Sequence, residues 1–339
     1  FDPDIRADMG LADWDFAGKN ADKPVARYLY DLFELTTPLA DRVPVSAYTW
    51  YSFPDLNGEN AVTFESYPEY LRGIIDEHGF HNIKLSMCDF EPHRYVELVH
   101  NVRAAVGPDV DIRVDPHASW GEAQALRFMR GVEDFHIEWI EEPVGGRFDH
   151  IFRAGHRLRL MSTIPISSHA WLPPLVKTPD DRGRYGDGTL DAQLNVAALR
   201  RWQPADISAP DAYAGPLALK RHYDAARFMG MGIGMHSAYE LGPAMAIRLH
   251  IAAFAFPYEI PYHIVWGRDR AVPPFSSHAL DAHYNQWEGD VIKGGKMIYD
   301  QGFLAVPDGP GLGVEFDHEL LAHYAFSEER AAAHTHHIE

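Results

Sequence analysis

From about residue 43 onward, short runs rich in β-branched residues alternate with longer segments in which apolar residues recur every three or four positions. This alternation is typical of βα units, in which helices connect parallel strands. Eight strands are expected to begin at Val43, Asn82, Asp111, His136, Thr163, Ala205, Gly232 and Tyr258. Eight such units in 339 residues predict an α/β fold, the (β/α)8 (TIM-type) barrel.

The segments between the expected strands have helical periodicity. The clearest of these candidate helices are residues 67–79, 92–107, 122–135, 216–230 and 241–254. Gly107 and Gly230 stand where two of them are expected to end. Residues 173–188, with the sequence PPLVKTPDDRGRYGDG, are expected to form a long loop after the fifth strand. Barrel enzymes keep their active-site loops at that end of the strands.

The net charge of −19 argues against a nucleic acid or an anionic membrane as a partner, because no broad basic face can offset phosphate repulsion. We find no secretory signal and no window near the ~20 apolar residues of a membrane span. The single cysteine, Cys88, fits a reducing cytoplasm. An anionic substrate would need a local cation in so acidic a protein.

Charged residues and histidines interrupt the apolar pattern near the ends of the expected strands, where barrel enzymes keep their catalytic groups. Burying so many ionisable groups costs free energy unless they are paired or bind a metal, so their concentration at one mouth indicates function. In strand order, the candidates are Lys84, Ser86, Asp115, His117, Glu141, His169, Asp211, His236 and His263.

Asp115, Glu141 and His169 come from three consecutive strands and could share one cation, with water or substrate at the open positions. The competing interpretation makes Asp115 and Glu141 partners of Arg113 or Lys84 in an internal salt network. Carboxylates are common at the strand ends of barrels, so the residues alone leave both interpretations open.

His236 and Asp211 form a second set. An aspartate on the preceding strand can hold an imidazole in one tautomer and raise its basicity, as a general base near neutral pH requires. The alternative is a core histidine with purely structural hydrogen bonds. Lys84 offers a cation to a substrate carboxylate, or else it pairs with Asp115 or Glu141. The remaining histidines, including the closing HTHHIE run, are expected to be solvated.

Six short motifs follow one another along the chain: KLS at Lys84, RVDPHASW at Arg113, WIEEP at Trp139, ISSHAW at Ile166, ADISAPD at Ala205 and GMHSA at Gly234. Their order and spacing resemble the mandelate racemase subgroup of the enolase superfamily. The tail VPDGPGLGVEFD from Val306, with the segment LGPAMAIRLHIAAF, is more similar to the glucarate dehydratase branch. The resemblance extends from about Phe1 to Asp317.

The resemblance implies a divalent metal held by Asp115 and Glu141, with His169 in the place of the third ligand. Mg²⁺ is the metal that the family implies. Imidazole suits Mn²⁺, Fe²⁺ or Zn²⁺ better than the hard Mg²⁺ ion. Either the metal is Mn²⁺ or another divalent ion, or His169 lies outside the coordination sphere.

The resemblance also implies that His236 is the base, that Asp211 orients it, and that Lys84 helps to neutralise a substrate carboxylate. The expected substrate-binding residues are Ser86, His117 and His263. His117 stands where relatives usually carry an asparagine. Ser86 stands where racemases carry a second lysine base. A hydroxyl without an activating base cannot take an α-proton, which favours a one-sided elimination.

The sequence therefore predicts a metal-dependent dehydratase of a sugar acid, an aldarate or aldonate, which removes the proton next to the carboxylate and expels the β-hydroxyl. The alternatives are an epimerase or racemase of a hydroxy acid, and a drifted barrel that binds metal and acid without turnover. The expected partner is a small-molecule carboxylate. The resemblance further implies homo-oligomers.

The family's N-terminal capping domain is expected to be largely absent from these 339 residues. Residues 1–42 are then a remnant or linker that leads from the cap into the barrel. Residues 43–300 form the barrel itself. Residues 301–339 are expected to pack back on the barrel or the cap.

Overall fold

A computed structural model describes residues 10–36, 38–49, 62–87, 91–146, 148–168, 200–210, 215–236, 240–255 and 279–325. Within these residues, eight parallel strands form one sheet in the order β7-β6-β5-β4-β3-β2-β1-β8. The first four strands are β1 (Arg42–Thr49), β2 (Asn82–Ser86), β3 (Asp111–Asp115) and β4 (Ile137–Glu141). Their side chains are almost all buried, as expected when helices cover one face of a parallel sheet and the other lines a filled barrel.

The second half of the sheet has shorter strands: β5 (Ile166–Ser168), β6 (Ile207–Ser208), β7 (Gly232–Ile233) and β8 (Leu280–Ala282). Strand β8 pairs with β1 on one side, and a parallel bridge joins Leu280 to Met235, just beyond β7, on the other. The sheet therefore closes on itself, which confirms the predicted barrel. The eighth position was predicted wrongly, because Leu280–Ala282 takes it, and the segment from Tyr258 lies outside the described residues.

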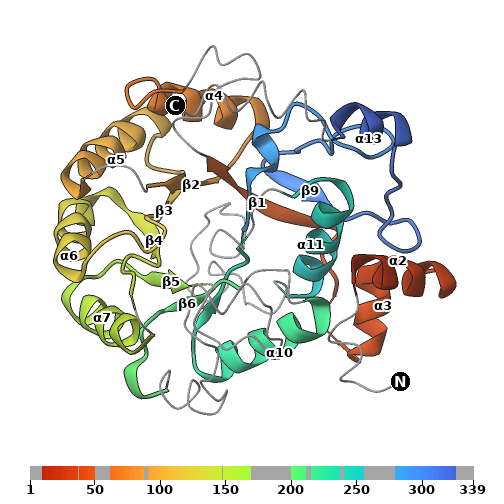
Figure 1. Ribbon diagram of the computed structural model, residues 1–339, viewed down its shortest axis with the longest axis horizontal. Helices are drawn as coiled ribbons and strands as arrows, with labels where there is room; N and C mark the ends of the chain where they lie inside the picture. Colours follow the sequence, from red (N-terminus) through yellow and green to blue (C-terminus); the bar gives the residue numbers. More distant parts are fainter. Residues whose placement is uncertain are drawn as a thin grey trace, which may run out of the picture.

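Six helices of the described residues surround the strands in a ring (Figure 1). They are α4 (Tyr67–His78), α5 (Pro92–Val106), α6 (Glu122–Gly131), α7 (Phe148–Met161), α10 (Gly215–Phe228) and α11 (Gly242–Ala255). A short 3-10 turn, η1 (Glu133–Phe135), follows α6. Gly107 directly follows helix α5 with a φ of 85°, and Gly230 lies two residues beyond the end of α10 with a φ of 74°, as predicted for helix ends. The expected loop 173–188 lies outside the described residues.

The chain on either side of the barrel packs beside helix α11 and strand β1 (Figure 1). The N-terminal helices are α2 (Leu11–Asn20) and α3 (Val25–Leu32). After β8 come η4 (His283–Gln286), β9 (Phe303–Ala305), which pairs antiparallel with β1, and α13 (His318–Tyr324). No capping domain is evident in the described parts of the chain, and no helix there has the length and apolar character needed to cross a membrane.

His250, a fully buried residue of α11, joins these segments. Its Nδ1 accepts a hydrogen bond from the Ala26 backbone N–H at 3.2 Å, and its Nε2 donates to the Leu312 carbonyl at 3.1 Å. Burial lowers the pKa of His250 to about 4. The expectation that histidines outside the candidate site are solvated was wrong for His250, because both ring nitrogens have buried backbone partners.

We expect the buried His250 ring to make the fold sensitive to acid. Its pKa is lower in the folded protein than in the unfolded chain, so the unfolded state takes up more protons as the pH falls below about 6.5, and stability is lost. At about pH 5 the contribution lost is on the order of 2 kcal/mol. Urea unfolding at about pH 7.5 and 5 checks this. His250→Gln, which keeps one acceptor and one donor, should lose less stability across this range; equal losses would contradict the assignment.

Candidate active site

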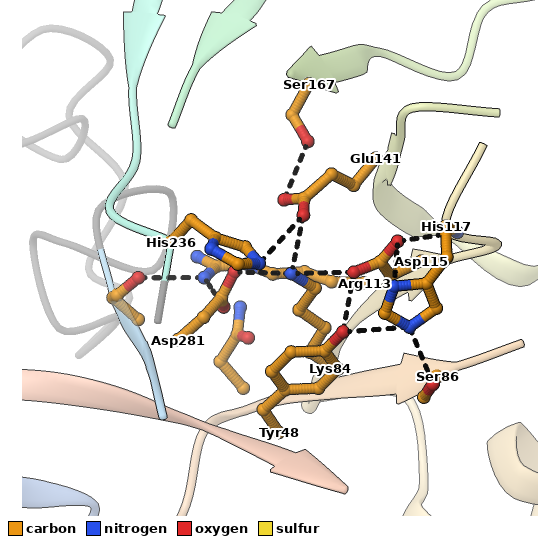
Figure 2. Close-up of polar contacts among 12 residues, drawn as sticks. Tyr48, Lys84, Ser86, Arg113, Asp115, His117, Glu141, Ser167, His236 and Asp281 are labelled. Atoms are coloured by element: carbon orange, nitrogen blue, oxygen red, sulfur yellow. Dashed lines mark hydrogen bonds and ion pairs between the residues drawn. The ribbon is translucent and has the colours of Figure 1, made fainter. Parts of the chain in front are cut away.

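Three strands bring polar side chains to one point inside the barrel. Asp115 ends β3, Glu141 ends β4, and His236 follows β7. Each of the three offers one metal-ligating atom, and these atoms all lie within 4.8 Å of one another. Figure 2 shows the three side chains converging from different strands. Asp115 and His236, which are more than a hundred positions apart in the chain, therefore belong to one cluster, which is compatible with a shared cation.

The ammonium of Lys84, on β2, lies among three carboxylates and has an exposed fraction of 0%. Its Nζ atom is 2.9 Å from Glu141 Oε1, 3.2 Å from Asp115 Oδ2 and 3.2 Å from Asp281 Oδ2. Burial opposes the charge, but the carboxylates together raise the pKa of Lys84 above its ordinary value. Lys84 is thus ion-paired internally, as one of the two sequence interpretations proposed. Its contact with a substrate carboxylate stays a prediction.

Arg113, on β3, is fully buried and forms a second ion-pair group beside the first. Its Nη1 donates to Asp281 Oδ1 at 2.6 Å, and its Nε donates to Glu138 Oε2 at 2.8 Å. The guanidinium carbon lies 3.7 Å from the centroid of the Trp139 ring. Asp281, on β8, therefore bridges the two buried cations, Arg113 and Lys84.

Among the residues that the structure describes, the two groups contain more carboxylates than cations. Lys84 and Arg113 supply two positive charges, and they face the four carboxyl groups of Asp115, Glu138, Glu141 and Asp281. Burial raises the pKa of Glu138 to about 7, against the lowering effect of Arg113, so this carboxyl is partly protonated near neutral pH. The remaining excess of buried negative charge is unfavourable unless a cation balances it. Two carboxylates and an imidazole are a donor set that divalent metals use, so the cluster fits such an ion.

His117 stands beside the acidic cluster on the side away from His236 (Figure 2). Its Nε2 is 2.8 Å from Ser86 Oγ and 3.2 Å from the Tyr48 hydroxyl, and the Tyr48 hydroxyl donates to Asp115 Oδ2 at 2.6 Å. The His117 side chain is 33% exposed, and its φ of 50° lies in the left-handed region. Such backbone strain clusters at functional sites. The hydrogen bond between His117 and Ser86 was not predicted from the sequence, and the role of Ser86 stays a prediction.

His236 is held at the end of β7 by its main chain. Its backbone N–H donates to the Pro210 carbonyl at 3.3 Å, and its own carbonyl accepts a hydrogen bond from Arg248 of α11. Arg248 is buried and ion-paired with Glu240. The imidazole Nε2 is 3.6 Å from Glu141 Oε1, and the side chain is 14% exposed. These contacts fix the backbone from which the ring projects into the cluster.

The ring of His283, in η4, stacks on the ring of Tyr48, with ring centroids 3.9 Å apart. It is buried, which lowers its pKa to about 3. This ring is a weak proton acceptor at neutral pH, and its stacking holds the Tyr48 ring in place. His283 is a second exception to the expectation that the remaining histidines are solvated.

Three predicted site residues, His169, Asp211 and His263, lie outside the described residues. Conversely, the structure adds Tyr48 and Asp281 to the site. Tyr48 sits in an apolar run and has the sequence pattern of a core aromatic. Asp281 lies on a strand of three residues, too short for a periodic signal. Direct pairing of β1 with β2 places Tyr48 beside Lys84, whereas only the closure of the barrel through β8 brings Asp281 there.

Comparisons with known proteins find similar sequences and folds. A family model described as "Enolase C-terminal domain-like" matches residues 67–168. A probable glucarate dehydratase of Streptomyces coelicolor is 24% identical over 83% of this chain and 58% of its own length. A D-gluconate dehydratase of Thermoproteus tenax is 25% identical over 94% of this chain and 55% of its own length. The chain thus spans a little over half the length of these two relatives.

Among solved structures, a Thermobispora bispora enolase complexed with magnesium and formate superposes with a TM-score of 0.69. It is 27% identical, and the match covers 92% of this chain and 65% of that one. The fold and the cluster define a (β/α)8 barrel with acidic groups converging on a candidate cation site. The chain is therefore similar to proteins of the enolase superfamily, and residues 67–168 match the family model.

Proposed function

We propose that this protein is a metal-dependent dehydratase of a sugar acid. The observation that carries the proposal is the convergence of two buried carboxylates that could hold a cation, Asp115 and Glu141, with the His236 imidazole beside them, where it could act as a base; their ligating atoms all lie within 4.8 Å. The dehydratases among its relatives support the same reaction class at low identity. The substrate would be an aldarate or aldonate that is converted to a 2-keto-3-deoxy acid.

Asp115 and Glu141 would hold the metal, with His169 as the predicted third ligand. Mg²⁺ is the metal we propose, in keeping with the magnesium of the Thermobispora bispora structure, and Mn²⁺ is the alternative because of the histidine. When bound, the ion would act as a Lewis acid that polarises the substrate carboxylate and makes the neighbouring C–H more acidic.

His236 would take the α-proton. A general base must come within hydrogen-bond reach of the proton it removes, and the 14% exposure of His236 leaves part of its side chain accessible to a substrate in the barrel mouth. Arg248 and Pro210 fix its backbone, which limits the positions that the ring can adopt. Asp211 is the predicted partner that would orient the ring.

His117 would serve as the second proton-transfer group. The electron pair of the broken C–H bond forms the new C=C bond, and the β-hydroxyl leaves as water after it receives a proton. His117 could donate that proton, because its ring is partly exposed and is hydrogen-bonded to Ser86 and Tyr48. The resulting enol then tautomerises to the 2-keto acid. The alternative is that His236 returns its own proton to a hydroxyl on the same face.

The proposal is tested by incubating the purified protein with a set of aldonic and aldaric acids in Mg²⁺ and in Mn²⁺, and by measuring the 2-keto product. At least one acid should give product, and chelation of the metal should abolish it. The proposal fails if a folded protein that binds metal gives no product from any acid of the set.

An epimerase is the second candidate, and the contact between His117 and Ser86 favours it. This pair and His236 lie on different sides of the cluster (Figure 2), so protons could be exchanged on two faces of a substrate. The same acids incubated in D₂O separate the two reactions. Epimerisation gives deuterated acid with inverted configuration, whereas elimination gives a keto product.

A further inference from the structure

Lys84 occupies an unusual position for a residue of a cation site. Its ammonium contacts both carboxylates that would bind the metal, Asp115 at 3.2 Å and Glu141 at 2.9 Å. An ammonium at these distances repels a divalent ion bound to the same carboxylates. Burial increases the repulsion, because little water can enter to screen it. A metal therefore has to compete with Lys84 for these two groups.

Asp281 offers Lys84 another partner. Its Oδ1 is held at 2.6 Å by Arg113 Nη1, which in turn donates to the Ala279 carbonyl at 2.8 Å. The Oδ2 atom of Asp281 is 3.2 Å from Lys84 Nζ. Asp281 is thus anchored by one oxygen and faces the lysine with the other, on the side of the ammonium opposite Asp115 in Figure 2.

We infer that Lys84 competes with the divalent metal for Asp115 and Glu141, and that Asp281 is the positioning residue that retains the Lys84 ammonium when the metal binds. The inference rests on the proposed metal site. In the metal-bound protein the ammonium pairs mainly with Asp281, and its charge stays compensated while Asp115 and Glu141 coordinate the ion. Lys84 thereby lowers the metal affinity and keeps the cluster stable without metal.

The direct test is the affinity for Mn²⁺, measured by calorimetry without substrate. Lys84→Met keeps a chain of similar length without the charge, and it should bind Mn²⁺ at least about tenfold more tightly than the natural protein. Lys84→Arg keeps the charge and is the matched control, with an affinity close to that of the natural protein. Equal or weaker binding by Lys84→Met would overturn the inference.

A double-mutant cycle tests the role of Asp281. Asp281→Asn should weaken Mn²⁺ binding by about tenfold, because Lys84 then relies on Asp115 and Glu141 alone. In the Lys84→Met background the same substitution should have little effect. If it weakens binding equally in both backgrounds, Asp281 acts on the metal without Lys84, and its proposed role is wrong.

Thermal unfolding with and without Mn²⁺ covers the case in which a neutral variant is unstable. Lys84→Met, or Lys84→Gln as a second neutral variant, should be stabilised by Mn²⁺ more than the natural protein, because the ion replaces the missing charge. Neutral variants that stay unfolded in millimolar Mn²⁺ would overturn the inference. All these measurements omit substrate, so a failure of the dehydratase proposal leaves them interpretable.

Discussion

Glu141→Gln is expected to lower the rate of α-proton removal by about 10³-fold or more. The substitution keeps the shape of the side chain but removes the charge that faces Lys84 Nζ at 2.9 Å and belongs to the candidate metal cluster. The loss should appear in kcat, and Mn²⁺ affinity should fall with it. The measurement is deuterium exchange at the α-carbon of any acid found to be a substrate.

Glu142→Gln is the matched control for this prediction. Glu142 is the next residue in the chain and is also buried, but its Oε1 accepts a hydrogen bond from Ser168 at 2.7 Å, and it is not a member of the candidate metal cluster. Its substitution should change the exchange rate far less. Equal losses from both substitutions would indicate that the strand end is merely disturbed, and would remove the support for a metal at Glu141.

His236→Asn should abolish α-proton exchange, with a loss on the order of 10³-fold, because the general base is removed. His117→Asn should behave differently if His117 donates the proton to the leaving hydroxyl. In that variant α-proton exchange should persist while formation of the keto product falls. For each of the two variants, deuterium incorporation and keto product are measured in the same reaction.

The contrast between the two histidine variants separates their roles. If His117→Asn loses exchange and His236→Asn retains it, the assignments of base and acid are reversed. If exchange persists in the natural protein with inversion and no keto product, the epimerase is the correct reaction. Circular dichroism of both variants shows whether a loss comes from unfolding.

Much of the site could be predicted because strand periodicity is a local property. Lys84 and Ser86 are two residues apart on β2, as are Asp115 and His117 at the end of β3, so each pair was expected to share a face. The carboxyl ends of parallel strands meet at one edge of a barrel, which brought Asp115 and Glu141 together in the prediction. Their meeting in the structure follows from the same rule.

The bridging of Arg113 and Lys84 by Asp281 could not be predicted in this way. That contact depends on β8 pairing with β1 and with Met235, and β8 has three residues with no distinctive pattern. The hydrogen bond between His117 and Ser86 likewise links neighbouring strands through a backbone turn of positive φ. In both contacts, the number of residues between the two partners in the sequence does not indicate how close their side chains lie in the folded protein.

The sequence by itself determined the class of fold and the strand ends at which ionisable side chains gather, because hydrophobic periodicity and strand alternation are encoded residue by residue. Only the tertiary structure decided which of these charges pair with which. Within the described residues, neighbouring strands place two cations among three carboxyl groups, and closure of the barrel through β8 adds the fourth, Asp281. The energy of that cluster depends on distances of about 3 Å between distant segments, and those distances exist only in the folded chain.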